Sequence, residues 1–135
     1  MLGKTFIMDR KIIIAGSIFG MTAIILGAFG AHALKAVLDS QQLASFETGV
    51  KYQMYHALLL LFIGIELRIS DKTKRRMFYL IIFGTLFFSG SIYLLVTRNL
   101  TQIDFRQFAF VTPIGGLLLI IAWILLFVEF LRKKS

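Results

Sequence analysis

Residues 12–34 read IIIAGSIFGMTAIILGAFGAHAL, an apolar run without a charged side chain. At 1.5 Å of rise per residue, a helix of about 20 residues crosses a hydrocarbon core of roughly 30 Å, so this stretch is long enough to span a membrane. Three further apolar stretches follow, from Tyr52 to Ile69, from Met77 to Val96 and from Phe108 to Leu131. The sequence therefore predicts an all-α integral membrane protein, a bundle of four transmembrane helices.

The composition agrees with lipid as the solvent. Hydrophobic residues make up 58% of the 135 residues and the mean hydropathy is +0.82, an apolar surface that a soluble domain of this size could not cover. The connections are short, so residues 1–135 are expected to form a single membrane domain. The first stretch is longer than the apolar region of a secretory signal, about 7 to 15 residues, and we interpret it as a retained span.

Positively charged residues are distributed unevenly among the connecting segments. Eleven lie before the first stretch, at the end of the second or just after it, or after the fourth, whereas four follow the first or third. By the positive-inside rule, this distribution predicts that both termini are cytoplasmic. It also explains the net charge of +8 without nucleic acid as a partner, and the cluster from Lys72 to Arg76 is expected to attract anionic membrane lipid.

Small residues form a stripe along the first stretch. They recur every three or four residues, the spacing of one face of an α-helix. The stripe consists of Gly16, Gly20, Ala23, Gly27 and Gly30. Helices in lipid associate by close packing, so this stripe is predicted to be a helix-packing seam rather than a ligand cleft.

The connection between the first two stretches carries a helix signal. Asp39 and Gln42 have the spacing of a capping pair, and apolar residues then follow at helical spacing. A short helical segment is therefore expected. The sequence leaves open whether residues 40–50 form a separate interfacial helix that turns at Gly49 or extend the second span.

Neutral polar groups concentrate near the outer end of the predicted spans. His32 lies near that end of the first span and His56 near that end of the second, so the topology predicts similar depths for both. The candidate polar layer consists of His32, Lys35, Tyr52, Gln53, Tyr55, His56, Ser89, Ser91, Tyr93 and Thr112. Polar groups in a membrane are costly and usually functional, which makes this layer the default candidate site.

Three interpretations of the layer compete. In the simplest, the side chains hydrogen-bond to one another and to headgroups and so tie the helix ends together. In the second, His32 and His56 hold a metal or haem, but two imidazoles alone are a sparse ligand set, and we expect no metal and no cofactor. In the third, the histidines line a proton or solute path, which would need more polar groups deeper in the spans.

The orientation of His32 bears on assembly. At 100° per residue, it points about 160° away from the glycine stripe, so the two faces cannot meet the same neighbour. Either the first helix is buried on two sides, or it is distorted near Gly27 and Gly30. The first alternative predicts a homo-oligomer or a membrane-protein partner.

The fourth stretch begins with Thr112-Pro113-Ile114-Gly115-Gly116, which has the character of a helix N-terminus. Thr112 is suited to cap the helix, and proline is favoured in a first turn. Thr112, Gly115 and Gly116 are therefore candidates for binding an anion or a lipid headgroup. The preferred alternative is that the two glycines admit a neighbouring helix.

No catalytic arrangement is recognisable in the sequence. Glu66 and Glu129 lie beside Arg68 and Arg132 near the cytoplasmic boundary, so we interpret them as salt-bridged residues. No nucleophile–base pair, phosphate-binding loop or pair of carboxylates at catalytic spacing is present, and the chain has no cysteine. The protein is not expected to be an enzyme.

Four motifs carry a family likeness: GAFGAHAL at 27–34, FETGVKYQMYHAL at 46–58, FSGSIY at 88–93 and TPIGG at 112–116. They resemble the YgdD-like and YwdK-like small bacterial membrane proteins, a domain of unknown function related to a small vertebrate transmembrane protein. The resemblance implies a four-span protein of the bacterial inner (plasma) membrane and carries no activity with it. The residues before Met8 lie outside its pattern, which suggests Met8 as the natural start.

These observations favour a non-catalytic accessory or assembly component that contacts lipid or another membrane protein through the first span. The alternative is a small-solute, ion or proton carrier that acts as an oligomer around the polar layer.

Overall fold

The computed structural model describes residues 2–104 and 106–132, and in this part of the chain all regular secondary structure is helical. The long helices are α1 (Leu2–His32), α2 (Ser40–Ile65), α3 (Asp71–Thr85) and α6 (Val111–Arg132). The shorter elements are η1 (Leu34–Ala36), the π-helical turn η2 (Leu86–Gly90), α4 (Ser91–Val96), α5 (Arg98–Thr101) and η3 (Arg106–Phe108). The predicted all-α fold is confirmed. Lys133 and Lys134, which contribute to the predicted charge asymmetry, lie outside the described residues.

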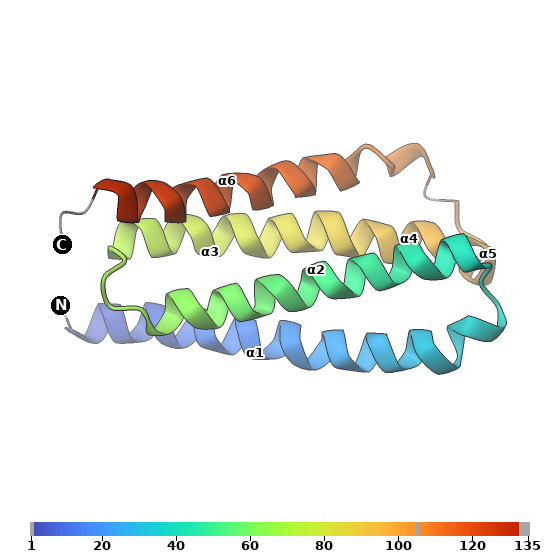
Figure 1. The fold of residues 1–135 in the computed structure, drawn as a ribbon, viewed down its shortest axis with the longest axis horizontal. Helices are drawn as coiled ribbons and strands as arrows, with labels where there is room; N and C mark the ends of the chain where they lie inside the picture. The colour runs from blue at the N-terminus through green and yellow to red at the C-terminus, as the bar shows by residue number, and fades with distance from the viewer. Residues whose placement is uncertain (1, 105, 133–135) are drawn as a thin grey trace.

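The long helices run alongside one another (Figure 1). The most extensive contacts join α1 to α2 and α3 to α6, and α2 also contacts α3, η2 and α4. The start of α1, the connection from α2 to α3 and the end of α6 all lie at one end of the molecule, which we call the basic end (Figure 1). The α1–α2 connection and the segment around α5 lie at the other, the loop end.

Three helical segments in the described part of the chain have the length and composition to cross a membrane. They are Ile7–Ala36, Asp71–Val96 and Arg106–Arg132. The predicted second span, Tyr52 to Ile69, is not among them, so the four-span prediction is supported only for three spans. The reason is local: Lys51, Gln53 and His56 reduce the mean hydropathy of α2. The helix also ends at Ile65, because Glu66 is extended with a ψ of 113°.

The open question about residues 40–50 is settled by α2, which is continuous from Ser40 to Ile65. The Asp39 carboxylate accepts from the backbone N–H of Gln42 (2.7 Å), and the Gln42 amide oxygen accepts from the N–H of Asp39 (3.1 Å). The predicted capping pair is therefore confirmed, and it starts a long helix rather than a short interfacial one. The chain does not turn at Gly49, which lies buried inside α2.

A buried ion pair joins α1 and α3 at the basic end. The Lys74 ammonium lies 3.0 Å from an Asp9 carboxylate oxygen, and the Lys74 side chain is only 1% exposed. The sequence predicts a connecting segment at Lys74, between the second and third stretches. That prediction is wrong because α3 begins at Asp71, which carries Lys74 one turn into the packed helix.

The carboxylate of Glu66, next to the end of α2, forms the predicted ion pair with Arg68 at 2.8 Å. Hydrogen bonds from the Arg68 side chain and backbone lower the pKa of Glu66 to about 2. Because this pKa lies below the unfolded value of about 4.3, the pair stabilises the fold above that pH and loses its effect as the pH falls toward 2.

We therefore expect a ¹³C NMR titration of the Glu66 carboxyl in micelles to show a midpoint well below pH 4. In Arg68→Gln the midpoint should return toward the ordinary glutamate range. A wild-type midpoint near the unfolded value would contradict the ion pair.

Candidate functional site

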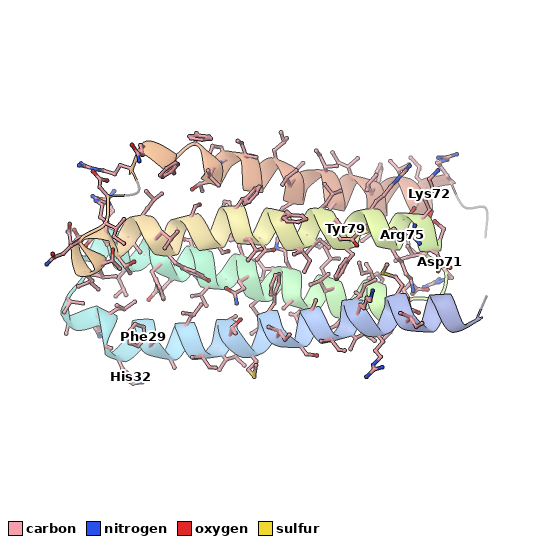
Figure 2. All side chains as sticks on the ribbon, turned by 180° about the vertical axis from the view of Figure 1, so that it is seen from behind. Phe29, His32, Asp71, Lys72, Arg75 and Tyr79 are labelled. Atoms are coloured by element: carbon pink, nitrogen blue, oxygen red, sulfur yellow. The ribbon has the colours of Figure 1, made fainter. Side chains whose placement is uncertain are left out.

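The two histidines do not meet. His32 ends α1 and is exposed, and Figure 2 shows it on the side of α1 turned away from the other helices. His56 is 4% exposed and lies in the middle of α2, at the level where Gly20 faces Ala57. Gly20 and His32 are separated by about 18 Å along α1 at 1.5 Å per residue. The predicted histidine pair is wrong because α2 starts at Ser40, which places His56 far from the loop end.

His56 instead joins α2 to α6 through Trp123. The indole N–H of Trp123 lies 3.1 Å from His56 Nε2, and His56 Nδ1 lies 2.7 Å from the backbone oxygen of Tyr52. The indole can only donate, so Nε2 accepts and Nδ1 carries the proton. This arrangement holds a neutral imidazole. Trp123 was not included in the predicted layer, although a tryptophan well inside a predicted span, whose N–H needs an acceptor, was a usable signal.

Gln53 is the centre of a second network, which ties three helices together. Its amide nitrogen donates to the Phe19 carbonyl (2.9 Å) and to the Thr22 hydroxyl (2.7 Å), both on α1. Its amide oxygen accepts from the Tyr93 hydroxyl on α4 (2.7 Å). The buried Gln53 amide therefore uses both donors and its acceptor inside the protein, and Thr22 is a member that the predicted layer lacked.

Two serines on consecutive elements connect different neighbours. The Ser89 hydroxyl in η2 donates to the Gly49 carbonyl of α2 (2.7 Å). The Ser91 and Thr112 hydroxyls hydrogen-bond to each other between α4 and α6. Side chains two residues apart in a helix are separated by about 200° around its axis, which explains why the two serines face opposite helices. A buried hydroxyl that lacks a hydrogen-bond partner in the described part of the chain belongs to Thr85.

The remaining members of the predicted layer lie on the surface. Lys35, Tyr52 and Tyr55 are exposed, and the Tyr52 ring contacts the rings of Tyr55 and Phe88. The predicted single layer is therefore divided into four separate internal sets of hydrogen bonds and a set of surface residues. Among the described residues, no group of three histidine, aspartate or glutamate side chains is arranged to hold a metal ion.

The glycine seam of α1 faces α2. A Cβ atom at Gly16 would lie 3.0 Å from the Ala57 carbonyl oxygen, and one at Gly30 would lie 2.9 Å from the Phe46 ring. Gly20 and Gly27 face Ala57 and Val50 at ordinary contact distances, and Ala23 is buried with them. The seam is thus covered by α2 of the same chain.

A comparable close approach explains the glycines of α6. A Cβ at Gly115 would lie 2.4 Å from the backbone nitrogen of Phe88, and Gly116 faces the Phe88 ring at 3.6 Å. Because α6 begins at Val111 rather than Pro113, Gly115 lies beyond the first turn, and its face is covered by η2. The Thr112 hydroxyl is paired with Ser91. These contacts favour the preferred alternative, in which the two glycines admit a neighbouring helix, over the anion or headgroup interpretation of Thr112, Gly115 and Gly116.

The Gln53 network is expected to make a measurable contribution to stability. Hydrogen bonds between membrane helices average about 0.6 kcal/mol and reach about 1.7 kcal/mol, so Tyr93→Phe should lower the unfolding free energy by an amount in that range. Gln53→Leu removes three bonds and should lower it further. Tyr55→Phe is the control, because Tyr55 is exposed. Unfolding in mixed micelles measures all three, and equal effects of Tyr93→Phe and Tyr55→Phe would contradict the network.

Residues 26–116 match a family model described as a protein of unknown function, DUF423. The chain is 43% identical to the UPF0382 membrane protein of Staphylococcus aureus over 119 residues, 88% of this chain and 93% of the relative. It is equally identical to the corresponding protein of Staphylococcus saprophyticus over 117 residues, 87% and 93% of the two chains. The UPF0382 inner membrane protein YgdD of Escherichia coli is 34% identical over 129 residues, 93% of each chain. No solved structure matches.

Proposed function

Because the chain belongs to the DUF423 family, whose relatives are membrane and inner membrane proteins, we propose that it is a non-catalytic accessory or assembly component of the bacterial inner membrane. In this proposal it crosses the bilayer four times as a helix bundle, with both termini in the cytoplasm. It contacts lipid or another membrane protein through α1.

The packing of α2 supports a fourth crossing. Gln53 and His56, which lower its mean hydropathy, are buried and hydrogen-bonded to other helices, so they do not face lipid. Satisfied polar groups inside a helix bundle are tolerated at membrane depth. Since α2 lies along α1 for most of its length, a bilayer that surrounds α1 also surrounds α2 (Figure 1).

The orientation follows from charge. Described basic side chains at the basic end come from the starts of α1 and α3 and from the end of α6, and they outnumber Lys35, Arg98 and Arg106 at the loop end and Lys51 within the first half of α2. By the positive-inside rule, the basic end is cytoplasmic.

One observation carries the non-catalytic role: the buried polar side chains of the candidate site are used in hydrogen bonds between helices. Gln53, His56 and Ser89 each bond to a different helix or turn. Such bonds stabilise a bundle, and they engage the buried side chains of the site, which could otherwise act as acid, base or nucleophile. The face of α1 opposite the seam exposes Ile14, Ile18, Met21 and Ile25, which suits contact with lipid or a membrane partner.

The carrier alternative has less support. It needs polar groups that continue across the membrane. His32 and His56 are separated by several helical turns, and His56 is enclosed by Trp123 and Tyr52.

The chain has no cysteine, which allows a clean test of topology. Gln41→Cys places a single thiol at the start of α2, and Leu67→Cys places one just beyond its end; both positions are exposed. With a membrane-impermeant maleimide, Gln41→Cys should react in spheroplasts and Leu67→Cys only after permeabilisation. Labelling of both positions from the same side would overturn the fourth crossing.

Reconstitution into liposomes tests the accessory role against the carrier alternative. Proton and ion flux should remain at the background of protein-free vesicles. Flux above background that is abolished by His32→Ala or His56→Leu would overturn the proposal in favour of the carrier.

A further inference from the structure

A polar cavity opens between the start of α3 and the end of α6 at the basic end. Its volume is about 420 Å³, within the range of small-ligand sites. It is lined by Ser70, Lys72, Thr73, Arg76, Leu125, Val128, Glu129 and Arg132. Figure 2 shows Lys72 beside the end of α6.

The charges around this cavity favour an anionic ligand. Three cationic side chains, from Lys72, Arg76 and Arg132, line it together with one carboxylate, from Glu129. One Glu129 oxygen accepts from the backbone N–H of Ser70 at 2.9 Å, which fixes α6 against the start of α3. Arginine and lysine from two helices therefore surround one cavity, an arrangement that suits phosphate oxygens.

The apolar part of the lining indicates which anion. Leu125 and Val128 lie one or two turns before Arg132 on α6, so the lining changes from apolar to cationic along the helix axis. A phospholipid at the edge of a bilayer has the same sequence of chemistry, acyl chain and then phosphate. Inorganic phosphate would leave the apolar wall without a partner.

A polar cavity at the loop end is a weaker candidate. Of its two arginines, Arg106 forms an ion pair with Asp104 at 2.8 Å, and Arg98 donates to the carbonyl oxygen of Leu95 at 2.8 Å. Part of the hydrogen-bonding capacity of each guanidinium group is therefore already used within the protein.

We propose that the cavity formed by Lys72, Arg76 and Arg132 binds the headgroup of one anionic glycerophospholipid, with its acyl chain along Leu125 and Val128. This inference deepens the proposed function, because it names the lipid and the place where it binds. It rests on α3 and α6 crossing the bilayer and does not depend on the α2 crossing or on the role of α1.

Native mass spectrometry of the purified full chain in detergent tests the inference. The probes are phosphatidylglycerol, phosphatidylcholine and inorganic phosphate, each titrated separately. The first phosphatidylglycerol should bind at least tenfold more tightly than phosphatidylcholine, and inorganic phosphate should not compete at equal concentration. Equal binding of the two lipids, or competition by inorganic phosphate, would overturn the lipid assignment.

Charge-neutral variants locate the site. One basic residue near a membrane surface contributes about fivefold in affinity, so Lys72→Gln combined with Arg76→Gln should weaken phosphatidylglycerol binding at least tenfold. Arg75→Gln is the matched control, since Arg75 is an exposed cation of the same helix that does not line the cavity. It should weaken binding less than twofold.

Binding at a defined site differs from diffuse attraction in its dependence on position. If Arg75→Gln weakens binding as much as Lys72→Gln alone, the attraction is a diffuse property of the basic end and the inference is wrong. If the double variant fails to fold, Lys72→Arg with Arg76→Lys preserves the charge and should retain lipid selectivity; loss of selectivity in this folded variant would also contradict the site. If the lipid binds selectively but both cysteines are labelled from the same side, only the four-span topology is refuted and the lipid site stands.

Discussion

Replacing Gly115 with alanine should separate α6 from the rest of the bundle. The added Cβ would lie 2.4 Å from the Phe88 nitrogen and 2.8 Å from the Gly84 oxygen, and both are backbone atoms. A flexible side chain can move away from such a contact, but the backbone of a packed helix cannot do so without shifting the helix. Overpacking usually costs about 1 to 3 kcal/mol, and we expect at least the upper value here.

The neighbouring glycine provides the matched control. A Cβ at Gly116 would meet the Phe88 ring at 3.6 Å, an ordinary contact distance. Gly116→Ala should therefore be neutral or slightly stabilising, since alanine favours a helix more than glycine does. Unfolding free energies in mixed micelles compare the two variants. Similar values for Gly115→Ala and Gly116→Ala would contradict the close approach of α6 to η2.

Removing the Asp9 carboxylate should have an effect of similar size. In Asp9→Ala the Lys74 side chain, which is 1% exposed in the protein, would lose its ion-pair partner. Breaking a buried ion pair by removing one partner typically costs about 3 to 5 kcal/mol, because an uncompensated charge is left in a medium of low dielectric constant. The measurement is again the unfolding free energy in mixed micelles.

The double variant Asp9→Leu, Lys74→Met separates the effect of an unpaired charge from the effect of lost packing. It removes both charges, so it should recover most of the stability lost in Asp9→Ala. Asp104→Ala, which removes an exposed ion pair with Arg106, should leave the unfolding midpoint nearly unchanged. A double variant as unstable as Asp9→Ala would show that the methylene packing of Lys74, and not its charge, is what matters.

The candidate polar layer, with its two histidines, shows how a reasonable prediction from sequence can fail. Placing His32 and His56 at one depth required the second helix to begin near Tyr52, where the apolar run begins. The Asp39 and Gln42 cap already indicated an earlier start, and a helix from Ser40 carries His56 about 24 Å inward. Hydropathy marks where lipid contact is favourable, whereas capping marks where a helix begins, and the two differ by about three turns here.

Sequence signals that span a few residues were sufficient to predict the helices themselves. Apolar length predicted α1, the α3–α4 segment and α6 as membrane-crossing helices, the Asp39 cap predicted the start of α2, and the small-residue spacing predicted one face of α1 for close packing. Helical geometry fixes all of these within one segment, because hydrogen bonds and side-chain spacing along a helix depend only on nearby residues.

Contacts between segments distant in the chain were decided only by the tertiary structure. The pairing of Gln53 with Thr22 and Tyr93, of His56 with Trp123, and of Lys74 with Asp9 depends on how far each helix is shifted and rotated against its neighbours. A change of one residue in register moves a side chain by about 100° and 1.5 Å, and hydropathy barely changes with it. Close approaches such as that of Gly115 to the backbone of η2 select one register among these, so the site follows from packing rather than from composition.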